Sequence, residues 1–539
     1  MTGNEILARS LKDHGVEVIF FLMGGPMIDC ENACLRQEIR MIDVRHEQAA
    51  AMMATAYSRL RRRPSVCMAC SGPGATNLVT GIANAFVDSA PVVAIGGASP
   101  VSHVGMGAFQ ETAQVALFRP ITRWADRCYD PRRIPELVAT AFRHAVGSRP
   151  GPVYLDMPGD ILYRDAPEEQ VRWTRPALDR ARPPGERHLV ERALDLIATS
   201  ERPVLVSGSG VLWAQAEEEL RTFVEQASVP FYATPQGRGA IPEDHRLSFL
   251  GARGTAWREA DLIAVIGTRQ NYVIGYTRPP RWNPDAKLIQ VDIDPAEIGR
   301  NRPVDVGIVG DAKAVLTQLL DAGAGAFHAE RRKAWVSYLA GQDEERRAEQ
   351  ERRMSNDAQP IHPLRLCKEV RDFLPRDAVL CVDGQEILNY ARSAIPFYAP
   401  HSLNSGPYGC MGVGLPFGLG AKVAAPDKLV VVLHGDGSFG LNAMEMDTAL
   451  RHRLPVVCVI SNNGGWTATD RFKVGRELGF IRYDLMFAAI GCHAEFVEEP
   501  GLIRPALERA AASGRPAVVN VVTDPTARAQ TVRFTDYST

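Results

Sequence analysis

Long apolar runs and a large excess of charge are both absent from this 539-residue sequence. No apolar run approaches the roughly 20 residues that a membrane-spanning helix needs, so we expect no membrane among the partners. The formal net charge of −2 offers no overall positive field for the phosphates of nucleic acid. We therefore expect no nucleic-acid partner either.

Paired cysteines and an export signal are also missing. The 10 cysteines are scattered, mostly within apolar runs. Cys67 and Cys70 have C-x-x-C spacing, but no second pair follows them and they lie in a strand-like run, which favours buried packing over a metal or redox site. Residues 1–5 lack the basic and apolar pattern of a signal peptide. Together these features favour a reducing, cytoplasmic location.

Short apolar strands that end in glycine turns and alternate with helical stretches dominate the chain. Examples are the runs 16–22, 65–70 and 91–96, each closed by a glycine-containing turn. The composition, 45% hydrophobic and 23% charged, is typical of a globular enzyme, and the chain is too long for one core. The alternation predicts an α/β protein with three doubly wound parallel-sheet domains.

Two polar stretches separate the predicted domains. Residues 164–187 are rich in Pro, Arg and Glu, and residues 329–356 are crowded with Glu, Arg and Gln, as in a solvated helix. The expected divisions are a first domain at 1–165, a central domain at 188–345, a third domain at 360–525 and a basic-aromatic tail at 526–539. A tail of this composition is disordered, crosses to a neighbouring subunit or closes as a lid over the ligand.

Two neighbouring strands of the third domain end in polar turns. The run 430–433 leads into Gly435-Asp436-Gly437-Ser438, a helix is expected over 442–450, and the run 455–460 leads into Asn462-Asn463-Gly464-Gly465. Because the carboxyl ends of parallel strands meet at one edge, the side chains of Asp436 and Asn463 and a carbonyl near Gly465 can supply oxygen ligands to Mg²⁺. A lone Gly-Asp-Gly turn is common, but the second turn favours a metal-diphosphate site.

These turns, together with Arg45-His46-Glu47-Gln48, resemble the cofactor motifs of thiamine-diphosphate-dependent enzymes. The resemblance covers essentially the whole chain, in the order pyrimidine-binding, central and diphosphate-binding domain. It implies thiamine diphosphate and Mg²⁺ as cofactors, with Asp436, Asn463 and the Gly465 carbonyl as metal ligands. It also implies that Glu47 hydrogen-bonds the aminopyrimidine ring and stabilises its imino tautomer.

Further cofactor contacts follow from the same resemblance. The segment 406–416 is similar to the one that bends the cofactor, which makes Met411 the wedge between its rings and places Gly409 at the pyrimidine edge. The implied cofactor-binding set is completed by Gln385, Gly435, Asp436, Gly437, Ser438, Asn463, Gly465 and Trp466. Because the family builds each site from two subunits, a homodimer is the smallest expected active unit and a homotetramer is expected in solution.

The substrate branch is indicated by the first and central domains. The segment 107–112 is similar to acetolactate synthases and 2-hydroxyacyl-CoA lyases, and its Gln110 is a candidate catalytic residue, whereas oxalyl-CoA decarboxylases tend to carry Tyr-Glu at 109–110. Segments 252–261, 267–272 and 292–303 resemble the nucleotide-binding region of CoA-using members. They imply ADP or CoA in the central domain. Candidate contacts to an acyl-CoA substrate are Arg253, whose fork suits phosphate, Asn389 and Arg392.

The resemblance is closest to lyases that split a 2-hydroxyacyl-CoA into formyl-CoA and a ketone or aldehyde, or run the reverse condensation. Such a reaction needs a proton shuttle, for which Asp470 and Glu477 are the candidates after the Asn-Asn turn; Asp470 is equally a helix cap. Family lyases carry this group on a short helix, expected here within 467–477. Alternatives are an oxalyl-CoA decarboxylase, an acetolactate-synthase-like carboligase that uses pyruvate and often a flavin, and a non-catalytic cofactor-binding protein.

Overall fold

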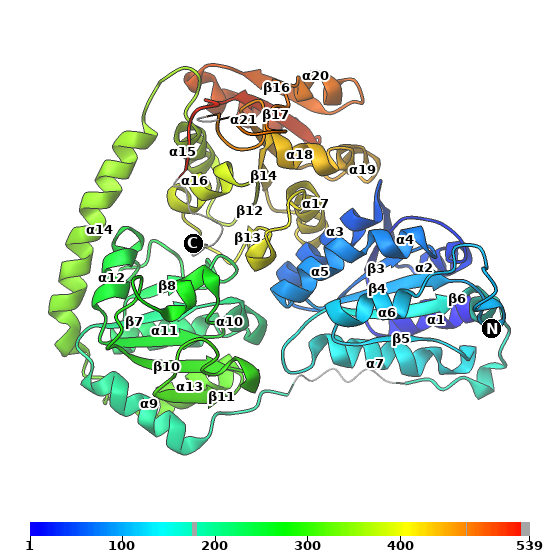
Figure 1. The fold of residues 1–539 in the computed structure, drawn as a ribbon, viewed down its shortest axis with the longest axis horizontal. Helices are drawn as coiled ribbons and strands as arrows, with labels where there is room; N and C mark the ends of the chain where they lie inside the picture. The colour runs from blue at the N-terminus through cyan, green and yellow to red at the C-terminus, as the bar shows by residue number, and fades with distance from the viewer. Residues whose placement is uncertain (175–180, 470–471, 530–539) are drawn as a thin grey trace.

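The computed structural model describes residues 1–174, 181–469 and 472–529, which form three parallel β-sheets flanked by helices. The sheets lie in three lobes: the first at the right of Figure 1, the central one at the lower left and the third at the top. Every strand pairing within the three sheets is parallel. The predicted α/β fold with three parallel sheets is confirmed.

The first sheet has six strands and the second has five. The first has the order β2 (Arg40–Asp43), β1 (Val18–Phe21), β3 (Ser65–Ala69), β4 (Val92–Ala98), β6 (Val153–Pro158) and β5 (Ala125–Arg127). The second has the order β11 (Val306–Val309), β10 (Lys287–Asp292), β9 (Leu262–Ile266), β7 (Pro203–Ser207) and β8 (Phe231–Ala233).

The third sheet carries the predicted metal turns. Its order is β13 (Ser402–Leu403), β12 (Val379–Asp383), β14 (Val430–Gly435), β15 (Val457–Asn462), β17 (Ala517–Val522) and β16 (His493–Val497). In its register Asp383 lies opposite His434, and Gly435 lies opposite Ser461. The ends of β12, β14 and β15 are therefore level, and the turns that follow them share one edge.

The first and third lobes pack together through α3 (Glu47–Arg61) and α17 (Gly414–Ala424). Gly420 of α17 lies against the backbone of Met53 in α3, so closely that a Cβ at position 420 would overlap the Met53 carbonyl. The glycine permits this approach of the two helices. As a result, the lobes that carry the two predicted halves of the cofactor site are fixed relative to each other within one chain.

The polar stretch at 329–356 forms α14 (Lys333–Met354), as its composition predicts. This helix runs along the left margin of Figure 1 and joins the central lobe to the third lobe. On it, Arg346 donates to the Gly251 carbonyl at 2.5 Å and Gln350 donates to the Ser393 carbonyl. The helix therefore contacts both lobes and bridges them along one side.

Two local predictions differ from the structure. The helix expected over 442–450 begins at Asp436 instead, as α18 (Asp436–Asn442) followed by α19 (Glu445–Arg451), because the extended Gly435 ends the strand and the next residue already has helical geometry. The short helix expected within 467–477 is absent from the described part of that segment, where Trp466 and Arg476 pair as in a strand bridge.

The predicted domain limits at 165, 188, 345, 360 and 525 stay predictions, with each sheet falling inside its expected range. Residues 530–539 of the predicted tail lie outside the described residues, so its lid or crossing role is a prediction as well. Among the helices that the structure describes, none has both the length and the apolar composition that crossing a bilayer requires.

Candidate active site

Asp436 is the first residue of α18 and is only 2% exposed. The backbone N–H groups of Gly437 and Gly465 point at its carboxylate, while its Oδ2 has no hydrogen-bond partner in the described structure. Burial raises the pKa of Asp436 to about 6. A buried carboxylate oxygen without a partner is costly, and a bound cation would compensate it.

Two further oxygens belong to the turn after β15. Asn463 donates through Nδ2 to the Thr467 carbonyl at 3.2 Å, which leaves Oδ1 as its acceptor atom for a ligand. A strand bridge joins the Trp466 N–H to the Arg476 carbonyl at 2.8 Å and the Leu478 N–H to the Gly464 carbonyl at 3.0 Å, so the Gly465 carbonyl lies outside it. One carboxylate, one carboxamide and one carbonyl are a donor set that suits Mg²⁺ with added phosphate oxygens.

A single cavity joins these groups to other predicted cofactor contacts. Trp466 covers one side of it, and a Cβ at position 437 would lie 2.6 Å from the Trp466 ring, which explains the glycine there. We call this space the cofactor cavity. The residues that line it include Gln385, Met411, Gly435, Asp436, Gly437, Ser438, Asn463, Gly465 and Trp466, all from the predicted set.

No group of three or more His, Cys, Asp or Glu side chains suited to a metal is present among the described residues. In the described part of the chain, two carboxylates, Asp436 and Glu386, line the cofactor cavity, and both oxygens of Glu386 already accept hydrogen bonds, so a cation there would meet Asp436 as its main protein charge. This agrees with a site that is completed by a diphosphate rather than by further carboxylates.

Met411 and Gly409 lie on the loop that leads into α17. Met411 lines both the cofactor cavity and a second cavity in the centre of the molecule, whereas Gly409 lines only the second. Gly409 has φ +70°, and the Gly412 carbonyl accepts a hydrogen bond from Asn442 at 2.7 Å. The loop is thereby held in a form that projects Met411 between the two spaces.

His434 supports the turn that carries Asp436 and was not predicted from the sequence. It is 1% exposed, its Nδ1 lies 3.1 Å from Ser438 Oγ, and Ser438 Oγ lies within 3.1 Å of the carbonyls of Asp383 and Gly435. Burial lowers the pKa of His434 to about 3, so the ring is neutral. A histidine that ends the apolar run of β14 was the available signal.

The other predicted half-site lies at the carboxyl edge of the first sheet. Glu47 begins α3, is 5% exposed and accepts a hydrogen bond at Oε2 from Asn77 Nδ2 at 3.0 Å. Gln110, at φ +59°, accepts a hydrogen bond from Ser71 Oγ at 2.5 Å. Asn77 and Ser71 are supporting residues that the sequence did not reveal.

Gln114 fixes the turn between these groups. It accepts a hydrogen bond from the Gly72 N–H at 2.7 Å and donates to Tyr154 Oη at 2.8 Å and Asp156 Oδ1 at 2.5 Å. This buried network anchors the end of the loop that carries Gln110. Glu47, in contrast, is not among the residues that line the cofactor cavity of the same chain.

A large cavity of about 880 Å³ adjoins the cofactor cavity and shares Gln385, Glu386 and Thr467 with it. We call it the arginine-lined cavity. Among the described residues its charged lining has two carboxylates, Glu349 and Glu386, against six arginines: Arg253, Arg281, Arg346, Arg353, Arg392 and Arg528. Arg253, Asn389 and Arg392, the predicted substrate contacts, all line it.

Trp257 gives the arginine-lined cavity an aromatic surface. It is 5% exposed, and its indole Nε1 has no hydrogen-bond partner in the described structure. The guanidinium groups of Arg253 and Arg281 lie 5.4 and 5.9 Å from its ring centroid. Charged forks beside an aromatic ring with a spare donor suit a phosphorylated ligand that also carries a planar or polar group.

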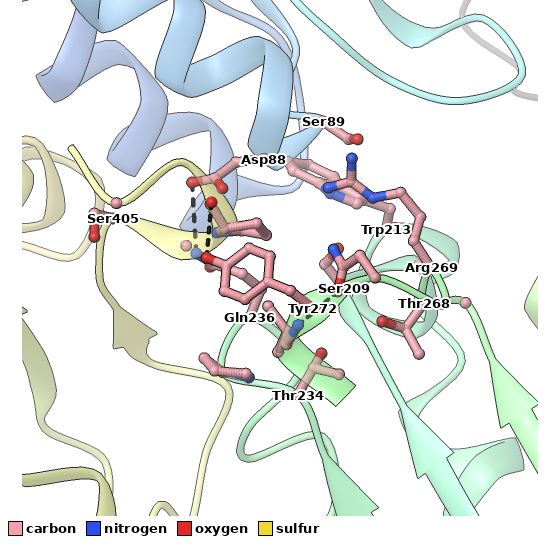
Figure 2. Close-up of a pocket in the computed structure, with 18 of the residues that line it drawn as sticks. Asp88, Ser89, Ser209, Trp213, Thr234, Gln236, Thr268, Arg269, Tyr272 and Ser405 are labelled. Atoms are coloured by element: carbon pink, nitrogen blue, oxygen red, sulfur yellow. Dashed lines mark hydrogen bonds between the residues drawn. The ribbon is translucent and has the colours of Figure 1, made fainter. Parts of the chain in front are cut away.

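The cavity that Gly409 and Met411 line in the centre of the molecule has a volume of about 260 Å³ and lies between all three lobes. Figure 2 shows Trp213, Arg269 and Tyr272 around it, with Asp88 and Gln236 on one side. Asp88 accepts a long hydrogen bond of 3.4 Å from Gln236, its Oδ1 has no partner in the described structure, and burial raises its pKa to about 7. Ser209 and Gly210, from the glycine turn that follows β7, also line the cavity.

The two predicted proton-shuttle residues are placed differently. Asp470 lies outside the described residues. The Glu477 side chain is 76% exposed and forms an ion pair with Arg476 at 3.1 Å. It is absent from the residues that line the three cavities described above.

Comparisons with known proteins agree with this geometry. Residues 1–117 match the N-terminal TPP binding domain of thiamine pyrophosphate enzymes, residues 190–319 match their central domain, and residues 387–521 match their C-terminal TPP binding domain. Over the whole chain, the acetolactate synthase large subunit of Mycobacterium tuberculosis is 36% identical over 97% of this chain and 96% of its own. The 2-hydroxyacyl-CoA lyase of Arabidopsis thaliana is 33% identical and the oxalyl-CoA decarboxylase of Escherichia coli is 32% identical, each over 99% of this chain and 97% of its own.

Proposed function

This chain belongs to the family of thiamine pyrophosphate enzymes, and from that premise we propose that it is a carbon–carbon lyase acting on coenzyme A thioesters. The reaction is the cleavage of a 2-hydroxyacyl-CoA into formyl-CoA and a ketone or aldehyde, or its reverse. The observation that carries this choice is the arginine-lined cavity beside the cofactor cavity.

The cofactor cavity would hold the diphosphate end of thiamine diphosphate through Mg²⁺. Asp436, Asn463 and the Gly465 carbonyl would be the protein ligands, and Asp436 Oδ2, a buried oxygen without a partner, supports this assignment. When bound, thiamine diphosphate supplies a nucleophilic carbon and then accepts the electron pair of the broken bond. Met411 would separate its two rings, since it projects between two cavities.

Glu47 would complete the site from a second copy of the chain. Within one chain it does not line the cofactor cavity, and the first and third lobes both carry exposed apolar side chains, as on a surface that a second copy covers. These side chains include Met23, Met106 and Phe109 near the first sheet edge, and Leu441, Met444 and Leu485 in the third lobe. The smallest active unit would be a homodimer, with a homotetramer proposed in solution and the cytoplasm as its location.

Coenzyme A explains the arginine-lined cavity better than a small keto acid does. Its 3′-phosphate and diphosphate carry several anionic oxygens, and a guanidinium group binds such oxygens through two parallel hydrogen bonds. Pyruvate carries one carboxylate, which can engage only one or two of the six guanidinium groups that line the cavity. Because the cavity meets the cofactor cavity at Gln385 and Thr467, a thioester whose phosphates lie among the arginines would reach the cofactor with its acyl end.

The chemistry requires one base and one acid. The 2-hydroxyl proton of the substrate must leave as the carbon–carbon bond breaks, and the formyl carbon must then gain a proton. Gln110, on the Glu47 side of the composite site, is proposed to bind the reacting oxygen. Asp470 and Glu477 remain the proposed proton carriers; for Glu477 this requires the exposed side chain to turn inwards when substrate binds.

The cavity between the three lobes would hold ADP, apart from the coenzyme A thioester whose phosphates are placed among the arginines. Its glycine turn, the Arg269 guanidinium and the Trp213 ring supply contacts for phosphate and a base, and Asp88 Oδ1 is an acceptor for a ligand donor. Tightly bound nucleotide would be found by heat denaturation of the purified protein followed by mass spectrometry of the supernatant.

A carboligase is the second candidate, since a relative at 36% identity is named acetolactate synthase. The two activities are separated by incubating the purified protein with thiamine diphosphate, Mg²⁺ and, in turn, 2-hydroxyacyl-CoA esters, oxalyl-CoA and pyruvate. We expect formyl-CoA and a ketone or aldehyde from the 2-hydroxyacyl-CoA esters. Acetolactate from pyruvate, or turnover of oxalyl-CoA alone, would refute the lyase assignment.

A further inference from the structure

Glu386 joins two segments that are far apart in the sequence. It begins α16 (Glu386–Ala394), next to Gln385, and lines both the cofactor cavity and the arginine-lined cavity. Its Oε1 accepts a hydrogen bond from Thr467 Oγ1 at 2.7 Å, and its Oε2 accepts one from the Ala529 N–H at 2.9 Å. A glutamate in the first turn of a helix is common, but two donors from distant segments go beyond that helix-end role.

Thr467 connects Glu386 to Asn463. The threonine has φ +58°, a conformation that β-branched residues rarely adopt, so its hydrogen bonds must hold it there. Its carbonyl accepts a hydrogen bond from Asn463 Nδ2 at 3.2 Å and one from Arg476 Nε at 3.0 Å. The bond to Asn463 sets which way the carboxamide faces, and therefore where its oxygen lies.

Ala529 belongs to a strap, residues 523–529, that follows β17. The Thr523 N–H donates to the Asn462 carbonyl at 2.8 Å, and the Pro525 carbonyl accepts a hydrogen bond from the Thr469 N–H at 2.8 Å. Thr523 and Ala527 line the cofactor cavity, whereas residues 528–529 line the arginine-lined cavity. The strap therefore forms part of the boundary between the two spaces.

We propose that Glu386 is a positioning residue that links the strap to the Thr467 turn through its two hydrogen bonds. Closure of the strap and orientation of the Asn463 side chain are then coupled to each other. The proposal rests on the function proposed above, because it takes Asn463 as a ligand of the cofactor metal. The order of contacts is Ala529 to Glu386, Glu386 to Thr467, and Thr467 to Asn463. Its consequence is slow release of the cofactor while the strap is in place.

Because Glu386 lines both cavities, a proton-transfer role is the competing explanation. Glu386→Gln separates the two. A glutamine can accept the Ala529 N–H with Oε1 and donate through Nε2 to the Thr467 hydroxyl oxygen, so it keeps both ties and removes the charge. Glu386→Ala removes both ties. Glu349→Ala is the matched control, since Glu349 lines only the arginine-lined cavity and pairs with the exposed Arg352.

The test measures hydrogen–deuterium exchange of peptides covering 463–469 and 523–529 in the full-length protein, without and with thiamine diphosphate and Mg²⁺. It also measures the rate at which loaded cofactor dissociates after dilution into chelator. In Glu386→Ala we expect exchange in both segments, and cofactor dissociation, to rise together by about tenfold, the order expected for loss of a charged hydrogen bond. Glu386→Gln and Glu349→Ala should match the wild type.

If Glu386→Ala exchanged faster in only one of the two segments, or in neither, the proposed link between them would be refuted. Wild-type exchange in Glu386→Gln combined with lost turnover would show a proton role instead, and would also overturn the proposal. Failure of the wild-type protein to bind thiamine diphosphate would reject the proposed function. The exchange comparison without cofactor would still decide whether Glu386 joins the two segments.

Discussion

Replacing Asp436 by Asn should stabilise the cofactor-free protein while abolishing its response to metal and cofactor. The carboxylate is 2% exposed and one of its oxygens has no partner in the described structure. Burial raises its pKa from 3.8 to about 6, which corresponds to about 3 kcal/mol against the charged form. Because the folded pKa lies above the unfolded one, this penalty is fully present above about pH 6 and is relieved as the pH falls towards 3.8.

The assay is thermal unfolding of both proteins at pH 5 and pH 8, with and without Mg²⁺ and thiamine diphosphate. An asparagine still accepts the N–H groups of Gly437 and Gly465 through its carbonyl, and its amide NH2 replaces the oxygen that has no partner, which costs less free energy than a buried charge. We expect Asp436→Asn to unfold at a higher temperature than the wild type at pH 8, with a smaller advantage at pH 5 and no shift on adding cofactor. A variant that is less stable than the wild type at pH 8, or that keeps the cofactor shift, would refute the reasoning.

Three further substitutions test separate parts of the site. Glu47→Gln should keep cofactor affinity, measured by calorimetry, and lower kcat by at least about 100-fold, because only the acid function is lost; unchanged kcat would contradict its role. Arg353→Ala should raise the KM for a coenzyme A thioester about fivefold at constant kcat, whereas Arg352→Ala, one position away, should not; equal effects would dismiss the arginine-lined cavity as the phosphate site. His434→Leu should weaken cofactor binding by about 1–2 kcal/mol through the loss of its bond to Ser438, and unchanged affinity would count against that support.

The strands and their polar turns could be predicted because their causes are local. An apolar, β-branched run that stops at a glycine turn predicts a buried strand without any knowledge of the rest of the chain. This is the case for β14 before Asp436 and for β15 before Asn463. The helix start at Asp436 was missed because the strand passes into the helix at a single extended glycine. Because β14 and β15 are parallel neighbours, their turns lie at the same edge of the sheet, and the residues on these turns could be predicted to line one cavity.

Side chains that meet through tertiary contact gave no comparable signal. Arg346 and Arg353 lie on a long polar helix that resembles an ordinary solvated surface, and only the fold brings it over α16 to form a basic cavity. Glu386 looks like a common helix-start residue until the Thr467 and Ala529 segments are in place. In both cases the functional context depends on residues separated by tens of positions or more.

Two copies of the chain are proposed to build each active centre, one supplying Glu47 and the other Asp436. The most direct measurement mixes or co-expresses Glu47→Gln and Asp436→Asn chains, each inactive alone, and follows formyl-CoA release. If the halves come from different copies, each mixed dimer contains one intact centre, and free exchange should restore about a quarter of the wild-type rate. No activity from verified mixed dimers would contradict the claim, because it would mean that both residues act within one chain.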